Sequence, residues 1–207
     1  MALVESSFED LSAMVRSFID GSPWLPLSGV TPVGARPTER IVFADGLSEE
    51  ELGRIESNFR FAFPPDLRVM LSVALPISKG FPDWRSAEAE DLETMLDWPA
   101  DGICFDISHN AFWFDAWGDR PLDTDTACST AREHIADAPV LIPIFGHRYI
   151  PSQPSLADNP VFSIWQSDIT YYGRDLLDYL NREFRVSHRD TPIAGTRRIP
   201  FWSDLIS

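Results

Sequence analysis

Residues Leu141–Phe184 read LIPIFGHRYIPSQPSLADNPVFSIWQSDITYYGRDLLDYLNREF and hold the clearest structural pattern of the chain. Two runs, residues 140–145 and 161–166, are rich in β-branched and aromatic residues and are bounded by Pro, Gly or Asn. Such runs predict two short buried strands. After Gly173 the apolar residues fall on one stripe of a helical period, which predicts a closing amphipathic helix.

A second informative segment, Leu47–Leu71, reads LSEEELGRIESNFRFAFPPDLRVML. Ser48 followed by Glu51 forms a capping box, in which each side chain satisfies a backbone amide at the start of a helix. Pro64-Pro65 breaks the chain and restarts it as a second helix, because proline suits the first helical turn. We expect three side chains of the first helix to face the core: Leu52, Ile55 and Phe59.

These features occur in an order that resembles the SUKH superfamily, which includes fungal cell-wall assembly regulators and bacterial toxin-immunity proteins. The resemblance extends from about Leu47 to Arg185: a helix opening with a run of Glu, a Pro-Pro-Asp-Leu helix start, strands, and Tyr-Gly before a last helix ending in Glu-Phe. It implies a SUKH-like fold and a non-enzymatic protein-binding module. In bacteria such a module resembles an immunity protein, which binds and neutralises a cognate toxin.

The remaining segments predict an α+β fold in which one mostly antiparallel sheet, of about five to six strands, carries helices on one face. The expected strands lie near residues 41–44, 103–107, 111–115, 140–145 and 161–166. Further helices are expected over residues 86–98 and 124–136, with a turn at 99–102. Residues 1–40 read as a helix followed by a Pro-rich arm packed on the domain. Residues 41–207 then form a single domain with an apolar C-terminal extension.

Composition narrows the class of protein. With 44% hydrophobic residues among 207, the chain can bury a core, and no apolar run reaches the roughly 18 residues of a membrane helix. The first twenty residues carry acidic side chains where a signal peptide needs basic ones, so we expect a cytoplasmic protein. Cys104 and Cys128 are too far apart for a paired metal or redox motif, and we expect neither a metal nor another cofactor.

The net charge of −15 disfavours nucleic acid as a partner, because phosphate contacts need clustered Lys and Arg. Residues 81–128 hold twelve acidic and two basic side chains. This segment is either a solubilising face or a surface that docks a basic protein, such as a nuclease toxin. Trp117, in a turn, is the expected exposed aromatic anchor. The expected partner-binding residues are Trp84, Asp106, Asp115, Trp117, Asp119, Arg120, Tyr171 and Tyr172.

A catalytic alternative rests on His109 with Asp106 and Asp115, joined in space by His147 and Asp168. A histidine flanked by carboxylates can act as a general base. No nucleophile motif or phosphate-binding loop accompanies these residues. The favoured interpretation is that Asp106, His109 and Asn110 cap a hairpin and that residues 147–149 form a polar edge. We therefore expect a protein that is not an enzyme. Two rivals stay open: a regulatory scaffold of the same fold that binds a host protein, and an enzyme of unrecognised class.

Overall fold

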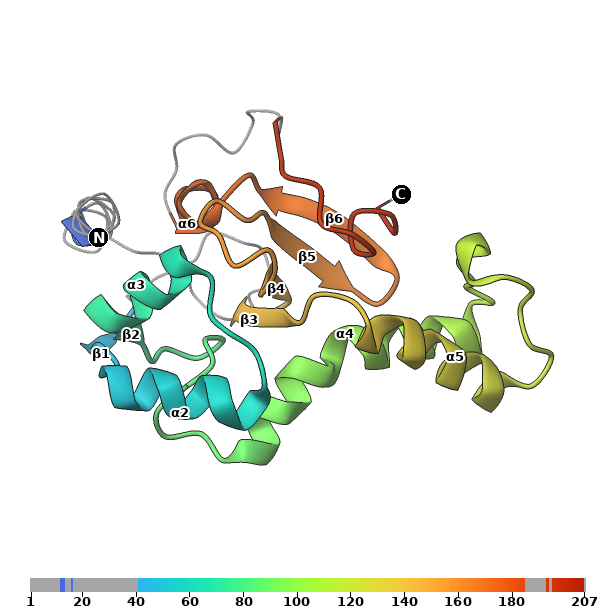
Figure 1. The fold of residues 1–207 in the computed structure, drawn as a ribbon, viewed down its shortest axis with the longest axis horizontal. Coiled ribbons are helices and arrows are strands. Elements are labelled where there is room, and N and C mark those ends of the chain that lie inside the picture. Colours follow the sequence, from blue (N-terminus) through green and yellow to red (C-terminus); the bar gives the residue numbers. More distant parts are fainter. Residues whose placement is uncertain (1–11, 14–15, 17–40, 185–192, 194, 207) are drawn as a thin grey trace, which may run out of the picture.

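The computed structural model describes residues 12–13, 16, 41–184, 193 and 195–206 (Figure 1). The expected N-terminal helix and Pro-rich arm lie, apart from three helical residues, outside the described residues. In chain order the elements are β1 (Phe43–Asp45), α2 (Glu49–Phe59), α3 (Pro65–Val73), β2 (Ala74–Pro76), α4 (Ala89–His109), the 3₁₀ helix η1 (Asp115–Trp117), α5 (Thr124–Ala136), β3 (Leu141–Phe145), β4 (Arg148–Pro151), β5 (Val161–Trp165), β6 (Asp168–Gly173) and α6 (Leu176–Phe184).

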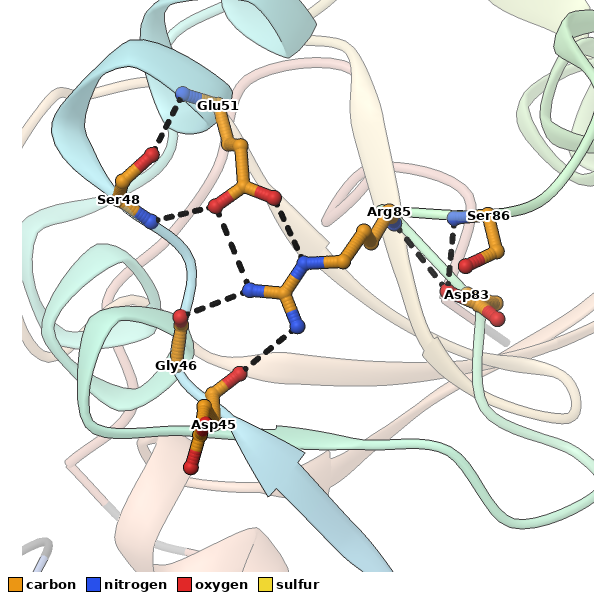
Figure 2. A network of polar contacts seen from close by, with 7 residues as sticks. All are labelled: Asp45, Gly46, Ser48, Glu51, Asp83, Arg85 and Ser86. Atoms are coloured by element: carbon orange, nitrogen blue, oxygen red, sulfur yellow. Dashed lines mark hydrogen bonds and ion pairs between the residues drawn. The ribbon is translucent and has the colours of Figure 1, made fainter.

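The start of α2 forms as the sequence predicts. Ser48 caps the helix, and the capping box with Glu51 is complete (Figure 2). Arg85 joins this network from a distant loop by donating to the Glu51 carboxylate and to the carbonyl oxygens of Asp45 and Gly46. The hydrogen bond from Arg85 lowers the pKa of Glu51 to about 2. Of the side chains expected in the core, two are buried and Phe59 is partly buried against them.

The strands form two antiparallel sheets: β1 pairs with β2, and β3-β4-β5-β6 form a meander in sequence order. The predicted strands at 140–145 and 161–166 are confirmed as β3 and β5. Each is followed by a two-residue turn and a returning strand that sequence reasoning interpreted as a polar edge or a turn. Gly146 and Gln166 occupy those turns with φ of 54° and 58°, the left-handed conformation that tight hairpins use.

The class α+β is confirmed, but the predicted single sheet of five to six strands with helices on one face is wrong. The larger sheet has four strands and an apolar core against each face. Alternation along the strands divides the side chains between these cores. The first core takes Ile142, Ile144, Ile150 and Val161 with α2, α3 and α6; the second takes Leu141, Tyr149, Phe162, Ile164 and Ile169 with the end of α4, with α5 and with residues 199–205.

Neither strand expected between residues 103 and 115 forms. Residues 103–107 are helical, and residues 111–115 run unpaired into η1. The sequence indicated a stop at Pro99, because proline lacks the N–H that bonds the carbonyl four residues earlier. In the fold that carbonyl, of Met95, accepts a hydrogen bond of 3.0 Å from the Tyr149 hydroxyl. A strand side chain thus supplies the donor that proline lacks, and the helix continues to His109.

The last described residues pack on the second core. Ile199, Trp202 and Leu205 are buried there, and the Trp202 indole donates a 2.7 Å hydrogen bond to the Pro139 carbonyl. Among the described residues, no helix has both the length and the apolar content needed to span a bilayer.

Candidate protein-interaction surface

The candidate surface is built on α4, which passes the end of the larger sheet and contacts both cores (Figure 1). Leu92 lies in the first core, whereas Ile103 and Ile107 lie in the second. Between them, Gly102 faces the β5–β6 turn so closely that a Cβ atom there would stand 2.8 Å from the Cα of Gln166. Only glycine permits this approach, so the hairpin turn and α4 are held side by side.

Asp106 fastens the same turn to α4. Its carboxylate accepts hydrogen bonds from the Ser167 amide, at 2.9 Å, from the Ser167 hydroxyl and from the Asn110 side chain. Burial raises the pKa of Asp106, but these hydrogen bonds outweigh it, and the pKa lies below its ordinary value. Asp106 is therefore an ionised anchor of the hairpin turn at neutral pH.

The fixed hairpin brings two exposed tryptophans together. Trp98 of α4 and Trp165 at the end of β5 lie with ring centroids 6.1 Å apart, and they are 42% and 52% exposed. His147, in the β3–β4 turn, packs edge-on against Trp165 at 5.6 Å. Asp168 is the cross-strand partner of Trp165 and is exposed. We call Trp98, Trp165 and Asp168 the tryptophan notch.

Burial, with a smaller contribution from Arg148, lowers the pKa of His147 to about 4. The imidazole is therefore neutral at neutral pH and places no positive charge beside Trp165. The guanidinium of Arg148 is itself buried: it lies 3.7 Å from the Tyr172 ring centroid, and its Nε is 3.7 Å from Glu183. The notch thus has a carboxylate at its edge and neutral aromatic groups around it.

The surface that leads away from the notch is acidic. Between residues 89 and 125 the described structure has one exposed cationic side chain, Arg120, against a run of exposed carboxylates. They are Glu90, Asp91, Glu93, Asp97, Asp101, Asp115, Asp119, Asp123 and Asp125. Phe105, on the same side of α4 as Trp98, is also exposed and stacks on His109 at 4.2 Å. We call this run of carboxylates, on α4, the loop after it and the start of α5, the acidic face.

Three residues expected to bind a partner are buried instead. Trp84 is 4% exposed and packs against Phe63, with ring centroids 5.3 Å apart, in the first core. Trp117 is 9% exposed, so the expectation that it is the exposed anchor is wrong: His134 and Phe201 stack on its ring. Asp106 is 5% exposed and bonded to Ser167, as described above.

The other expected partner-binding residues are spread over the fold. Asp115, Asp119 and Arg120 are exposed in the loop after α4, where Arg120 also donates a 2.8 Å hydrogen bond to the Ile107 carbonyl. Tyr171 and Tyr172 are half-buried and pack against opposite cores. The Tyr171 hydroxyl donates to Ser203 at 2.7 Å. These two tyrosines therefore do not form one rim.

The residues of the catalytic alternative have other partners. His109 is hydrogen-bonded through Nδ1 to the Phe105 carbonyl, Asp106 is engaged by Ser167, and His147 lies against Trp165. In the part of the chain that the structure describes, no histidine forms an ion pair with a carboxylate. Nor does that part contain a group of three or more His, Cys, Asp or Glu side chains placed to hold a metal ion.

A groove of about 350 Å³ lies between α4, the end of α2, the end of α5 and the start of β3, and two carboxylates of the acidic face reach it. Phe59, Leu96, Pro139 and Trp202 supply much of its wall, with Glu93 and Asp97 at its edge. Among the described residues that line it there is no histidine, cysteine or serine. Arg60, at the end of α2, also lines the groove, so a cation faces the two carboxylates there.

Sequence reasoning missed the notch. The sequence places Trp98 at the end of an expected helix and Trp165 within an expected strand, with nothing to bring them together. One signal was available: Phe105 follows Trp98 by seven residues and His109 follows Phe105 by four, which is the spacing of one helical face. This spacing becomes visible only if the helix is assumed to continue past Pro99. Comparison of the chain with protein-family models, with curated proteins and with solved structures returned no match.

Proposed function

We propose that this chain is a non-enzymatic protein-binding module of SUKH type that uses the acidic face to bind a partner with a basic surface. The observation that carries the proposal is the run of nine exposed carboxylates on α4, the following loop and the start of α5. Between residues 89 and 125 of the described chain the one exposed cation is Arg120, and Arg132 of α5 pairs with one of the nine, Asp101. Such a field attracts a basic protein and speeds its association.

The partner that fits best is a bacterial toxin domain, possibly a nuclease, which the chain neutralises as an immunity protein in the cytoplasm. A nuclease must present a basic groove to its substrate, and an acidic protein can cover that groove. The resemblance of Leu47–Arg185 to the SUKH superfamily supports the same assignment. Asp115 and Asp119 are the exposed residues of the acidic face that the sequence already singled out.

The proposal can be tested by replacing Phe105 with a photo-crosslinking phenylalanine analogue in the native host. A matched control carries the analogue at Val42, which is 54% exposed and directly precedes β1. The captured protein is then produced alone and with the chain in a bacterial host. We expect a basic protein that crosslinks from position 105, is toxic alone and is neutralised by the chain. Capture of a neutral or acidic protein, or toxicity unchanged by co-production, contradicts the proposal.

A further inference from the structure

We propose that the tryptophan notch receives an arginine side chain from a basic segment of the partner. This inference rests on the proposed function and names the point where the partner is anchored. It starts from the exposure of Trp98 and Trp165, which together leave a large apolar area in water next to a carboxylate. Single exposed apolar residues are ordinary, but paired exposed indoles are typical of contact sites.

The two elements that carry the indoles are held together by contacts within the chain. Trp98 lies on a helix whose course past Pro99 is fixed by Tyr149, and Trp165 ends a strand whose turn is fixed by Asp106. Gly102 brings the two elements into backbone contact. The backbone positions of the two indoles are therefore set before a partner binds, and such preorganisation favours affinity.

The chemistry of the notch fits a guanidinium better than other groups. The faces of indole rings attract cations, and tryptophan does so most strongly among aromatic side chains. Asp168 stands directly opposite Trp165 across the hairpin, so its carboxylate lies on the same face of the sheet. A planar guanidinium can stack on a ring while its N–H groups bond a carboxylate, whereas an ammonium offers only a point charge.

In the described structure, the two basic residues next to each other in the β3–β4 hairpin place no exposed cation beside Trp165. His147 contacts Trp165 as a neutral ring, and Arg148 is turned inward to Tyr172 and Glu183. Arg132 of α5 is paired with Asp101 of α4. The carboxylates of α4 continue the negative potential from the notch along the helix, which complements a segment carrying several arginines.

The test uses the full chain and a blocked hexa-arginine peptide, with hexa-citrulline as the uncharged match. Indole N–H signals are followed by NMR during titration and assigned with Trp98→Phe and Trp165→Phe. We expect hexa-arginine to shift these two indole signals first and hexa-citrulline to leave them unmoved. We also expect Trp98→Ala, Trp165→Ala and Asp168→Asn each to weaken binding roughly two- to fivefold. Leu122→Ala, at a fully exposed position outside the notch, should not.

Three results overturn the inference: shifts confined to other residues, affinity unchanged in the three variants, or equal binding of hexa-citrulline. Sedimentation that shows a dimer lost in Trp98→Ala also overturns it, because the notch is then covered by a second copy. If an alanine variant fails to fold, the phenylalanine variants serve instead, since they keep the packing and weaken the attraction for cations. A crosslinked partner that still binds all notch variants, but not an Asp115→Lys variant, leaves the proposed function standing and removes only the arginine site.

Discussion

Removing the Asp106 carboxylate should destabilise the fold and loosen the notch. Asp106→Ala deprives the amide and hydroxyl of Ser167, and the side chain of Asn110, of their acceptor. A hydrogen bond to a charged group contributes about 1.5–3 kcal/mol. Because Asn110 is exposed and can turn to water, we count mainly the two bonds from Ser167. Because Ser167 is only partly buried, water replaces part of these two bonds, and the expected loss in the free energy of unfolding is about 2–4 kcal/mol.

The assay is urea unfolding at neutral pH, followed by circular dichroism. Asp97→Ala is the matched control, since Asp97 is an exposed aspartate of the same helix, and it should change the free energy of unfolding by less than about 0.5 kcal/mol. The exciton signal of the Trp98–Trp165 pair gives a second reading, because it requires the hairpin turn to stay beside α4. It should weaken in Asp106→Ala and persist in the control.

The pH dependence follows from the lowered pKa of Asp106. A carboxyl whose pKa is lower in the folded state contributes stability above its unfolded pKa, near 3.8, and loses it as pH falls through the folded value. The difference in stability between the wild type and Asp106→Asn should therefore be constant above about pH 5 and shrink as the pH falls below 4. An Asp106→Ala variant within 0.5 kcal/mol of the wild type, with its exciton signal intact, would refute this account of the turn.

Three further predictions concern the same framework. Tyr149→Phe removes the donor to the helical carbonyl that proline leaves unpaired, and should cost about 1–2 kcal/mol in urea unfolding; an unchanged midpoint would contradict the pairing. Gly102→Ala should destabilise the fold, whereas Gly53→Ala in α2, with open space around its Cβ position, should stabilise it by up to about 1 kcal/mol; equal effects would exclude the close approach. Burial lowers the pKa of His147 to about 4 and raises that of Asp66 to about 6. Between pH 6.5 and 4, stability from His147 should be lost as pH falls, while that from Asp66 should be gained; unfolding of His147→Gln and Asp66→Asn against the wild type separates the two slopes, and identical slopes would exclude both assignments.

The sequence predicted correctly those elements that depend on residues close together in the chain. The capping box at Ser48 needs only residues three positions apart, and β3 and β5 are short runs of strand-forming residues. The strands β4 and β6 were missed because polar residues around His147 and Ser167 look like a loop, and only pairing with the preceding strand makes them extended.

The errors in α4 and at Trp117 have a non-local cause. The continuation of α4 through Pro99 depends on Tyr149, fifty residues further along the chain, so no helix rule could anticipate it. Trp117 is covered in part by Phe201, from the last described segment. The acidic character of residues 81–128 was visible in the sequence because charge needs no folding argument. The pairing of Trp98 with Trp165 was not, because it depends on where a hairpin turns.

The association rate constant of the crosslinked partner, at low and high salt, tests the central claim most directly. The chain is compared with charge reversals at Asp115 and Asp119 and with Glu50→Lys, an equal change of charge at an exposed position on α2. If the acidic face steers the partner, association should slow steeply as salt rises, and Asp115→Lys or Asp119→Lys should slow it more than Glu50→Lys does. A rate that is indifferent to salt and to both reversals would contradict the account and leave the acidic face as a solubilising surface.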